Sequence, residues 1–140
     1  MRIAIINGPN LNTLGKREPA LYGNTPFEPF LIGLQQQYPQ HLITCFQSND
    51  EGAVVTALQQ AGDECDAVIL NAGAYTHTSL AIADAVRSMG IPVIEVHLTN
   101  IFAREQFRHH SYLTPVCKGL IAGLGLDGYR LAVAHLTAKP

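Results

Sequence analysis

Tyr22 and Arg17 lie in one polar segment, residues 10–23, which also contains glycines and a proline. The phenol of a tyrosine has a pKa of about 10, so it acts as a general base only where its surroundings lower that pKa. A neighbouring guanidinium does this, because its positive charge favours the phenolate. The segment is therefore a candidate catalytic loop. The alternative is a surface loop in which the Tyr22 ring packs and Arg17 pairs with Glu18.

Glu95 and His97 are separated by one residue in an apolar run that predicts a strand. Side chains two positions apart on a strand point to the same face, so the carboxylate can orient the imidazole and raise its pKa. A histidine held in this way can serve as a general acid near neutral pH. The alternative is a histidine with a purely structural hydrogen bond at the end of a strand.

Neutral donors and cations occur near other strand ends, at Asn71, His77, Arg104 and Arg108. These residue types suit a small anionic molecule that carries several hydroxyl groups. The spacing of Arg104 and Arg108 would place them one turn apart on a helix. That spacing equally suits an exposed helix face or ion pairs with Glu105.

Apolar runs alternate with helical patterns along the chain and predict the elements that must position these residues. We expect strands at 3–6, 41–46, 67–70, 92–96 and 120–122, and an irregular loop over residues 7–24. Helices are expected at 27–38, from a cap at Asp50 through Ala61, from a cap at Thr78 or Ser79 to Met89, and at 128–136. Helical crossovers join parallel strands, so we predict an α/β fold. Its form would be a flavodoxin-like, doubly wound three-layer sandwich with a five-stranded parallel sheet and five crossover or flanking helices, in a single catalytic domain at 1–140.

The polar candidates fall in three segments that follow predicted strands, residues 7–22, 71–77 and 95–108. In doubly wound sheets, ligands bind beyond the carboxyl ends of the strands, near the point where the strand order reverses. The clustering therefore predicts an active site at this edge of the sheet.

The composition favours a cytoplasmic protein. The net charge of −2 gives no reason to expect nucleic acid as a partner, and no apolar run reaches transmembrane length. The three cysteines have no CxxC spacing and are expected to be reduced thiols, and the N-terminus has no signal-peptide pattern. A charged fraction of only 14% suggests contacts between subunits.

Three other kinds of site are not supported. Residues 123–128 match GxGxxG, but only twelve residues follow Gly128, so the rest of a dinucleotide-binding unit does not fit and a tight strand–helix turn is the better interpretation. No GxxxxGK[ST] motif is present, which excludes a P-loop. The six histidines lack HxxxH or HExxH spacing, so we expect no metal.

Several motifs together, in order along essentially the whole chain, resemble the type II 3-dehydroquinate dehydratase family. They are residues 6–12, 14–15, 17–19, 22–23, 47–49, 51–52, 71–74, 76–79, 95–98, 100, 103–105 and 121–125. The resemblance implies dehydration of 3-dehydroquinate to 3-dehydroshikimate through an enolate, with no cofactor. This reaction is a step of the shikimate pathway of aromatic amino-acid biosynthesis, and the sequence leaves a role in quinate catabolism as the alternative.

The resemblance also implies a role for each catalytic group. Tyr22 would take the C2 proton, with Arg17 holding it in its ionised state on a lid. Asn10 would hold a water that stabilises the enolate. His97 would protonate the departing C1 hydroxyl, and Glu95 would orient His97.

The remaining roles concern binding and assembly. The resemblance assigns substrate hydroxyls to Asn71, His77 and Arg108, and the substrate carboxylate to the backbone amides of Leu98 and Thr99. Arg104 would support the site electrostatically, and Asp84 would reach the site of a neighbouring subunit. The implied assembly is a homo-oligomer, a dodecamer built as a tetramer of trimers.

Some residues differ from the family pattern, among them Thr99 in place of the usual Ser and Tyr75 in place of a smaller aliphatic residue. The lysines, at 16, 118 and 139, lie outside the strand cores, which argues against the Schiff-base route of the unrelated type I enzymes. Two other functions are alternatives: a non-catalytic flavodoxin-like binding or signalling domain, and an inactive homologue that serves as an assembly scaffold.

Overall fold

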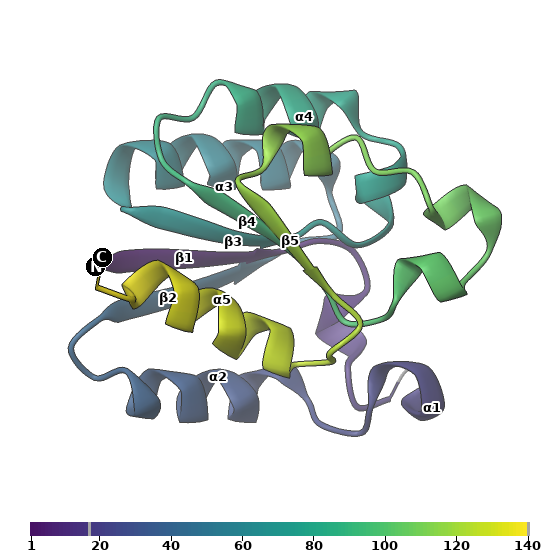
Figure 1. Ribbon diagram of the computed structural model, residues 1–140, viewed down its shortest axis with the longest axis horizontal. Helices are drawn as coiled ribbons and strands as arrows, with labels where there is room; N and C mark the ends of the chain where they lie inside the picture. The colour runs from purple at the N-terminus through teal and green to yellow at the C-terminus, as the bar shows by residue number, and fades with distance from the viewer. Residues whose placement is uncertain (17, 140) are drawn as a thin grey trace.

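Five parallel strands form the central sheet of the computed structural model, which describes residues 1–16 and 18–139 (Figure 1). The strands are β1 (Arg2–Asn7), β2 (Leu42–Gln47), β3 (Ala67–Asn71), β4 (Val93–His97) and β5 (Gly119–Ala122). Their order across the sheet is β2-β1-β3-β4-β5, and every neighbouring pair is parallel. The order reverses between β1 and β3, which is the winding of flavodoxin-like folds.

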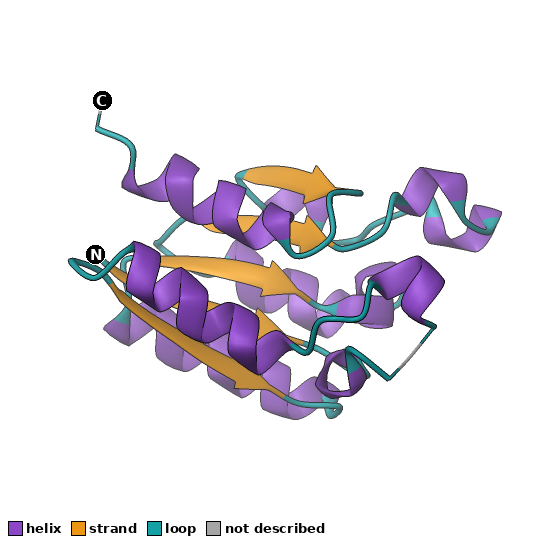
Figure 2. Ribbon diagram, turned by 90° about the horizontal axis from the view of Figure 1, so that it is seen from below, coloured by secondary structure: helices purple, strands orange, loops and turns teal. Residues whose placement is uncertain are grey.

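Helices cover both faces of this sheet. Helices α2 (Phe27–Gln37) and α5 (Asp127–Thr137) lie on one face, and α3 (Glu51–Glu64) and α4 (Leu80–Arg87) lie on the other, as Figures 1 and 2 show. The predicted α/β class, the doubly wound three-layer arrangement and the five-stranded parallel sheet are confirmed.

The alternation of side chains along β1 divides the core into two layers. Ile3 and Ile5 pack towards α2 and α5, whereas Ala4 and Ile6 pack towards α3 and α4. All four are at most 8% exposed. A strand buried on both faces reads as a continuous apolar run, which is why the sequence predicted β1 and β3 clearly.

The start of α4 is fixed by a side-chain cap. Ser79 Oγ accepts a hydrogen bond of 2.9 Å from the backbone N–H of Ile82, which satisfies one of the helix's unpaired donors. Ser79 is thus the capping residue, and Thr78 is not. Asp50 occupies the expected N-cap position of α3, but its side chain makes no capping hydrogen bond.

Two connections differ from the prediction. Residues 7–24 are not wholly irregular, because they contain a 3₁₀ turn, η1 (Leu11–Thr13), and the short helix α1 (Pro19–Tyr22), whose proline has the backbone angle of a first helical turn. The crossover from β4 to β5 uses three 3₁₀ turns in place of an α-helix: η3 (Ile101–Ala103), η4 (Gln106–Arg108) and η5 (Thr114–Val116).

The loops after β1 and β3 approach each other closely. The N–H of Gly8 donates a 2.7 Å hydrogen bond to the carbonyl of Asn71, and a Cβ at position 8 would lie 2.4 Å from the Ala72 carbonyl oxygen. Only glycine allows this approach, which brings the carboxyl ends of the two strands together. The GxGxxG match is the tight β5–α5 turn that was expected, with Gly128 against Val96.

We predict opposite effects for two Gly→Ala substitutions. Gly8→Ala should lower the free energy of unfolding by about 1–3 kcal/mol, because the new methyl group meets backbone that cannot move aside easily. Gly33→Ala should raise it by about 0.5–1 kcal/mol, because Gly33 lies in the interior of α2 with open space around it. Thermal and urea denaturation would measure both. Equal stability of the two variants would contradict the close approach at Gly8.

Candidate active site

A cavity of about 170 Å³ opens at the carboxyl ends of β1, β3 and β4. Its lining includes eight of the residues that the sequence singled out: Asn10, Tyr22, Asn71, His97, Leu98, Thr99, Arg104 and Arg108. These residues come from three separate segments, and the parallel sheet gathers them because all its strands end at the same edge. The structure therefore has a polar cavity at the edge of the sheet where the sequence predicted the site.

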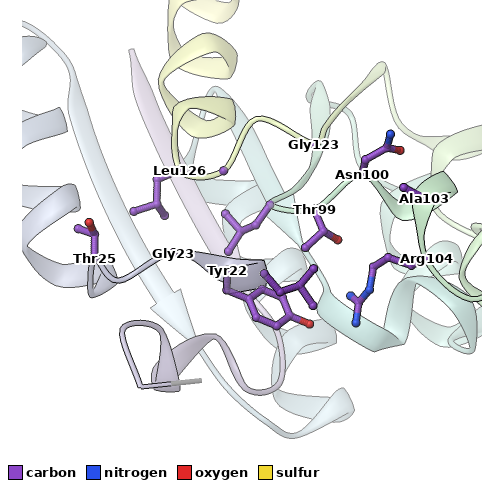
Figure 3. A pocket seen from close by; sticks show the side chains of 12 residues that line it. Tyr22, Gly23, Thr25, Thr99, Asn100, Ala103, Arg104, Gly123 and Leu126 are labelled. Carbon is purple, nitrogen blue, oxygen red and sulfur yellow. The ribbon is translucent and has the colours of Figure 1, made fainter. Parts of the chain in front are cut away.

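A larger neighbouring cavity of about 460 Å³, shown in Figure 3, shares part of its wall with this one. Tyr22, Leu98, Thr99 and Arg104 line both. The guanidinium carbon of Arg104 lies 5.6 Å from the centre of the Tyr22 ring, close enough for a cation–π interaction. In Figure 3 the two side chains lie side by side along the wall, next to Thr99. Arg17, the cation expected next to Tyr22, lies outside the described residues.

Glu95 and His97 form the pair that the strand alternation predicted. Glu95 Oε2 and His97 Nε2 are 2.6 Å apart, and both side chains are buried. Two hydroxyls also donate to the carboxylate, Ser111 Oγ at 3.1 Å and Thr114 Oγ1 at 2.5 Å. The sequence analysis missed both residues, because they lie 16 and 19 positions away and only the folding of the β4–β5 connection brings them back to β4.

These contacts decide the protonation of Glu95. Burial raises the pKa of the carboxyl, but the hydrogen bond and charge of His97 and the two hydroxyl donors outweigh it, so the pKa falls below its ordinary value of 4.5. Glu95 is therefore ionised at neutral pH, and its Oε2 accepts a hydrogen bond from His97 Nε2, which must carry a hydrogen. This arrangement leaves the other ring nitrogen of His97, Nδ1, for proton exchange.

His77 stacks against His97, with ring centres 6.4 Å apart and planes tilted by 22°. Its Nδ1 lies 2.7 Å from the carbonyl oxygen of His110, which requires a hydrogen on that nitrogen. Burial lowers the pKa of His77, and the positive charge of Arg108 lowers it further. His77 is therefore neutral, and its Nε2 can accept a hydrogen bond. It lies beside the cavity and is not among the residues that line it.

Asn10 has a left-handed backbone conformation with φ of 69°. Asparagine adopts this conformation more readily than most residues. The N–H of Asn10 donates to Asn49 Oδ1 at 3.0 Å, and its carbonyl accepts from Thr13. Both backbone polar groups are thus engaged, and the exposed side chain remains at the rim of the cavity.

Asn71 is held from two sides. Its Nδ2 donates to the buried hydroxyl of Tyr129 at 3.0 Å, and its Oδ1 accepts from the N–H of Gly73 at 3.2 Å. The Tyr129 hydroxyl in turn donates to Asn7 Oδ1 at 2.7 Å. The sequence analysis did not single out Tyr129, although a tyrosine on the buried side of a helix normally requires a hydrogen-bond partner.

Arg104 and Arg108 do not share a helix face, because Arg104 follows η3 whereas Arg108 is the last residue of η4. Both are half-buried and both approach Glu105, with Nε to Oε2 distances of 3.8 and 2.9 Å. The ion-pair alternative is thus confirmed, and the helical spacing was wrong. Both arginines nevertheless line the cavity, where they supply positive charge.

Asp84 lies away from the cavity of its own chain. It is on the exposed side of α4, where its Oδ1 accepts a 2.9 Å hydrogen bond from Arg87. Within the described residues, no group of three or more His, Cys, Asp or Glu side chains is arranged to hold a metal ion. The described helices also include none with the length and apolar character needed to cross a membrane.

Fold and site together define the class: a flavodoxin-like α/β protein in which a tyrosine and a carboxylate-bound histidine line one polar cavity. The sequence matches the family described as dehydroquinase class II over residues 1–137. The chain belongs to this family, and the resemblance inferred from the sequence is confirmed.

Individual relatives cover nearly the whole chain. A 3-dehydroquinate dehydratase of Bacillus pumilus is 49% identical over 138 residues, which are 96% of this chain and 93% of that protein. A catabolic 3-dehydroquinase of Penicillium rubens is 48% identical over 136 residues, 96% of this chain and 88% of that protein. The crystal structure of a type II dehydroquinase from Butyrivibrio crossotus has a TM-score of 0.95 at 44% identity, covering 99% of this chain and 98% of that one.

We predict that Thr114→Val shifts the acid unfolding of the protein to higher pH. Because the pKa of Glu95 is lowered by folding, its stabilising contribution is complete above the unfolded value near 4.5 and is lost as pH falls through the lower folded value. Removing one hydroxyl donor raises the folded value towards 4.5, so the contribution of the Glu95 charge to stability should be smaller and should be fully lost at a higher pH than in the wild type. Urea denaturation from pH 3 to pH 7, spanning this window, would measure it.

Thr56→Val is the matched control, because the Thr56 hydroxyl donates only to a backbone carbonyl within the exposed side of α3. Its pH profile should follow that of the wild type. Identical profiles for Thr114→Val and wild type would show that the hydroxyl does not support the Glu95 charge.

Proposed function

We propose that the chain dehydrates 3-dehydroquinate to 3-dehydroshikimate by acid–base catalysis, without a cofactor. The observation that carries the proposal is that Tyr22 and the Glu95-bound His97 line one cavity at the switch point of the sheet. Membership of the class II dehydroquinase family and relatives named 3-dehydroquinate dehydratase support the substrate and reaction. Residues 1–140 would act as one catalytic unit.

The first step is removal of a proton from C2 of the substrate, which is acidic because C2 adjoins the C3 ketone. Tyr22 as phenolate accepts this proton, and the C–H electron pair forms the C2–C3 double bond of an enolate. The positive charges of Arg17 and Arg104 would favour the phenolate of Tyr22. Arg104 would do so from its position against the Tyr22 ring. The enolate oxygen needs a donor already in place, and a water held by the Asn10 side chain would provide it.

The second step expels the hydroxyl group at C1. The enolate electrons return to form the C1–C2 double bond as the C1–O bond breaks, and His97 donates a proton so that water leaves. Glu95 supports this step by holding His97 in one orientation and by stabilising its protonated form. The ketone is restored, so atoms and charge balance without any oxidant or reductant.

Substrate binding would use the remaining polar groups. Arg108 and Asn71 in the cavity wall, together with the adjacent His77, are placed to bind hydroxyl groups. The backbone amides of Leu98 and Thr99 would bind the carboxylate. We further propose a cytoplasmic homododecamer, a tetramer of trimers, in which Asp84 reaches the site of an adjacent subunit.

Tyr22→Phe should lower kcat by about 10²- to 10⁴-fold, because it removes the general base. Turnover would be followed by the ultraviolet absorbance of the conjugated enone product. Tyr38→Phe is the matched control, since Tyr38 lies at the end of α2 and does not line the cavity. A folded wild type without turnover, or a Tyr22→Phe variant with full turnover, would contradict the proposal.

His97→Asn and Glu95→Gln should differ in the size of their effects. His97→Asn removes the general acid, with an expected loss in kcat of about 10²- to 10⁴-fold. Glu95→Gln keeps the shape and loses the charge that stabilises protonated His97, so its loss in kcat should be smaller than that of His97→Asn. Steady-state kinetics would measure both, and a larger loss in Glu95→Gln than in His97→Asn would contradict these roles.

A further inference from the structure

A buried chain of hydrogen bonds connects α5 to the wall of the cavity. Asn7 and Asn71 end the neighbouring strands β1 and β3 and are paired in register. The hydroxyl of Tyr129 bridges their side-chain amides, at 2.7 Å from Asn7 Oδ1 and 3.0 Å from Asn71 Nδ2. Tyr129 has no exposed surface, and the two asparagines are at most 2% exposed. No step of the proposed reaction uses Tyr129.

The backbone fixes the direction of this chain. The N–H of Gly73 can only donate, so the Asn71 atom facing it at 3.2 Å must be the carbonyl oxygen. The amide nitrogen of Asn71 then faces Tyr129, and the hydroxyl must accept from it. The hydroxyl proton is consequently given to Asn7 Oδ1.

This direction limits what Asn71 can present to a ligand. One N–H of its amide is committed to Tyr129, and its oxygen accepts from Gly73. A rotation that exchanged nitrogen and oxygen would place two donors together at Gly73 and lose the hydrogen bond between them. The second N–H is the donor that the amide retains for the cavity.

Burial also keeps the bridge in one protonation state. It raises the pKa of Tyr129 far above that of an exposed tyrosine, so the hydroxyl remains protonated at neutral pH. The ring is fixed as well, since it packs against Phe27 and Phe30 with centres 5.1 and 6.0 Å away. The bridging oxygen therefore has one position and one role.

We propose that Tyr129 is a positioning residue for substrate binding: acting through Asn71 alone, its hydroxyl fixes the orientation in which the Asn71 amide offers an N–H to a hydroxyl group of the substrate. The proposal rests on the proposed function and names a further residue of the same site. Because Asn71 contacts the substrate before and during the reaction alike, the effect falls on binding more than on the chemical step.

The first test is Tyr129→Phe, which removes the bridging oxygen and keeps the ring. We expect kcat/KM to fall about tenfold, mainly through a higher KM, with kcat within about threefold of wild type. Tyr38→Phe, a change of the same type at the end of α2, should leave both constants unaltered. A purely structural role would lower the melting temperature of Tyr129→Phe and leave KM unchanged, which would overturn the proposal.

The second test is a double-mutant cycle with Asn71→Ala. If Tyr129 acts through Asn71, then Tyr129→Phe should change kcat/KM by less than about twofold in the Asn71→Ala background. If the two substitutions lower kcat/KM by independent factors that multiply in the double variant, the proposal is overturned, because Tyr129 would then act by another route.

Two further outcomes are separable. If Tyr129→Phe does not fold, Asn7→Ala provides the same test, since it keeps Tyr129 and removes the acceptor that orients its hydroxyl. The KM of Asn7→Ala should rise about threefold, and an unchanged KM would overturn the proposal. A wild type that does not turn over 3-dehydroquinate would overturn the proposed function and this inference together. Normal wild-type turnover with an unaffected Tyr129→Phe would overturn this inference alone.

Discussion

The fully buried carboxylate of Glu95 is the constraint on which the site depends. A charge without solvent is stable only when hydrogen-bond donors surround it, and here the donors are His97, Ser111 and Thr114. Two of them belong to the connection between β4 and β5, so this long segment has to fold back over the end of β4. That path also carries the two arginines of the cavity wall. The ionised Glu95 thus determines both the tautomer of His97 and the course of the chain around it.

A second constraint acts at the other side of the cavity, where β1 and β3 end in register. The contact of Gly8 with the loop after β3 leaves no room for a side chain, and the paired Asn7 and Asn71 are bridged by Tyr129 of α5. Polar groups buried between two strands and a helix must satisfy one another. The same bonds that stabilise the switch point therefore also present an amide to the cavity, so the stability of the fold and the arrangement of the site are coupled there.

Most of the fold could be predicted because its signals are local. Continuous apolar runs marked the strands of the sheet, and apolar spacing marked α2, α3, α4 and α5. The alternation along β4 also predicted the contact of Glu95 with His97. Prediction failed where local signals compete: the spacing of Arg104 and Arg108 suggests a helix, yet the segment forms separate 3₁₀ turns around Glu105. Asp50 stands at the expected cap position of α3, although its side chain makes no capping bond.

The sequence by itself determined the family, the parallel sheet and the edge at which the polar residues gather, because residue order and periodicity are properties of the chain alone. The tertiary structure decided which distant groups complete the site. Ser111 and Thr114 reach Glu95, and Tyr129 reaches Asn71, across separations of 16, 19 and 58 residues. No periodic pattern spans such distances. These partners are selected by the need of buried polar groups for hydrogen bonds, and that need arises only when the layers of the fold have come together.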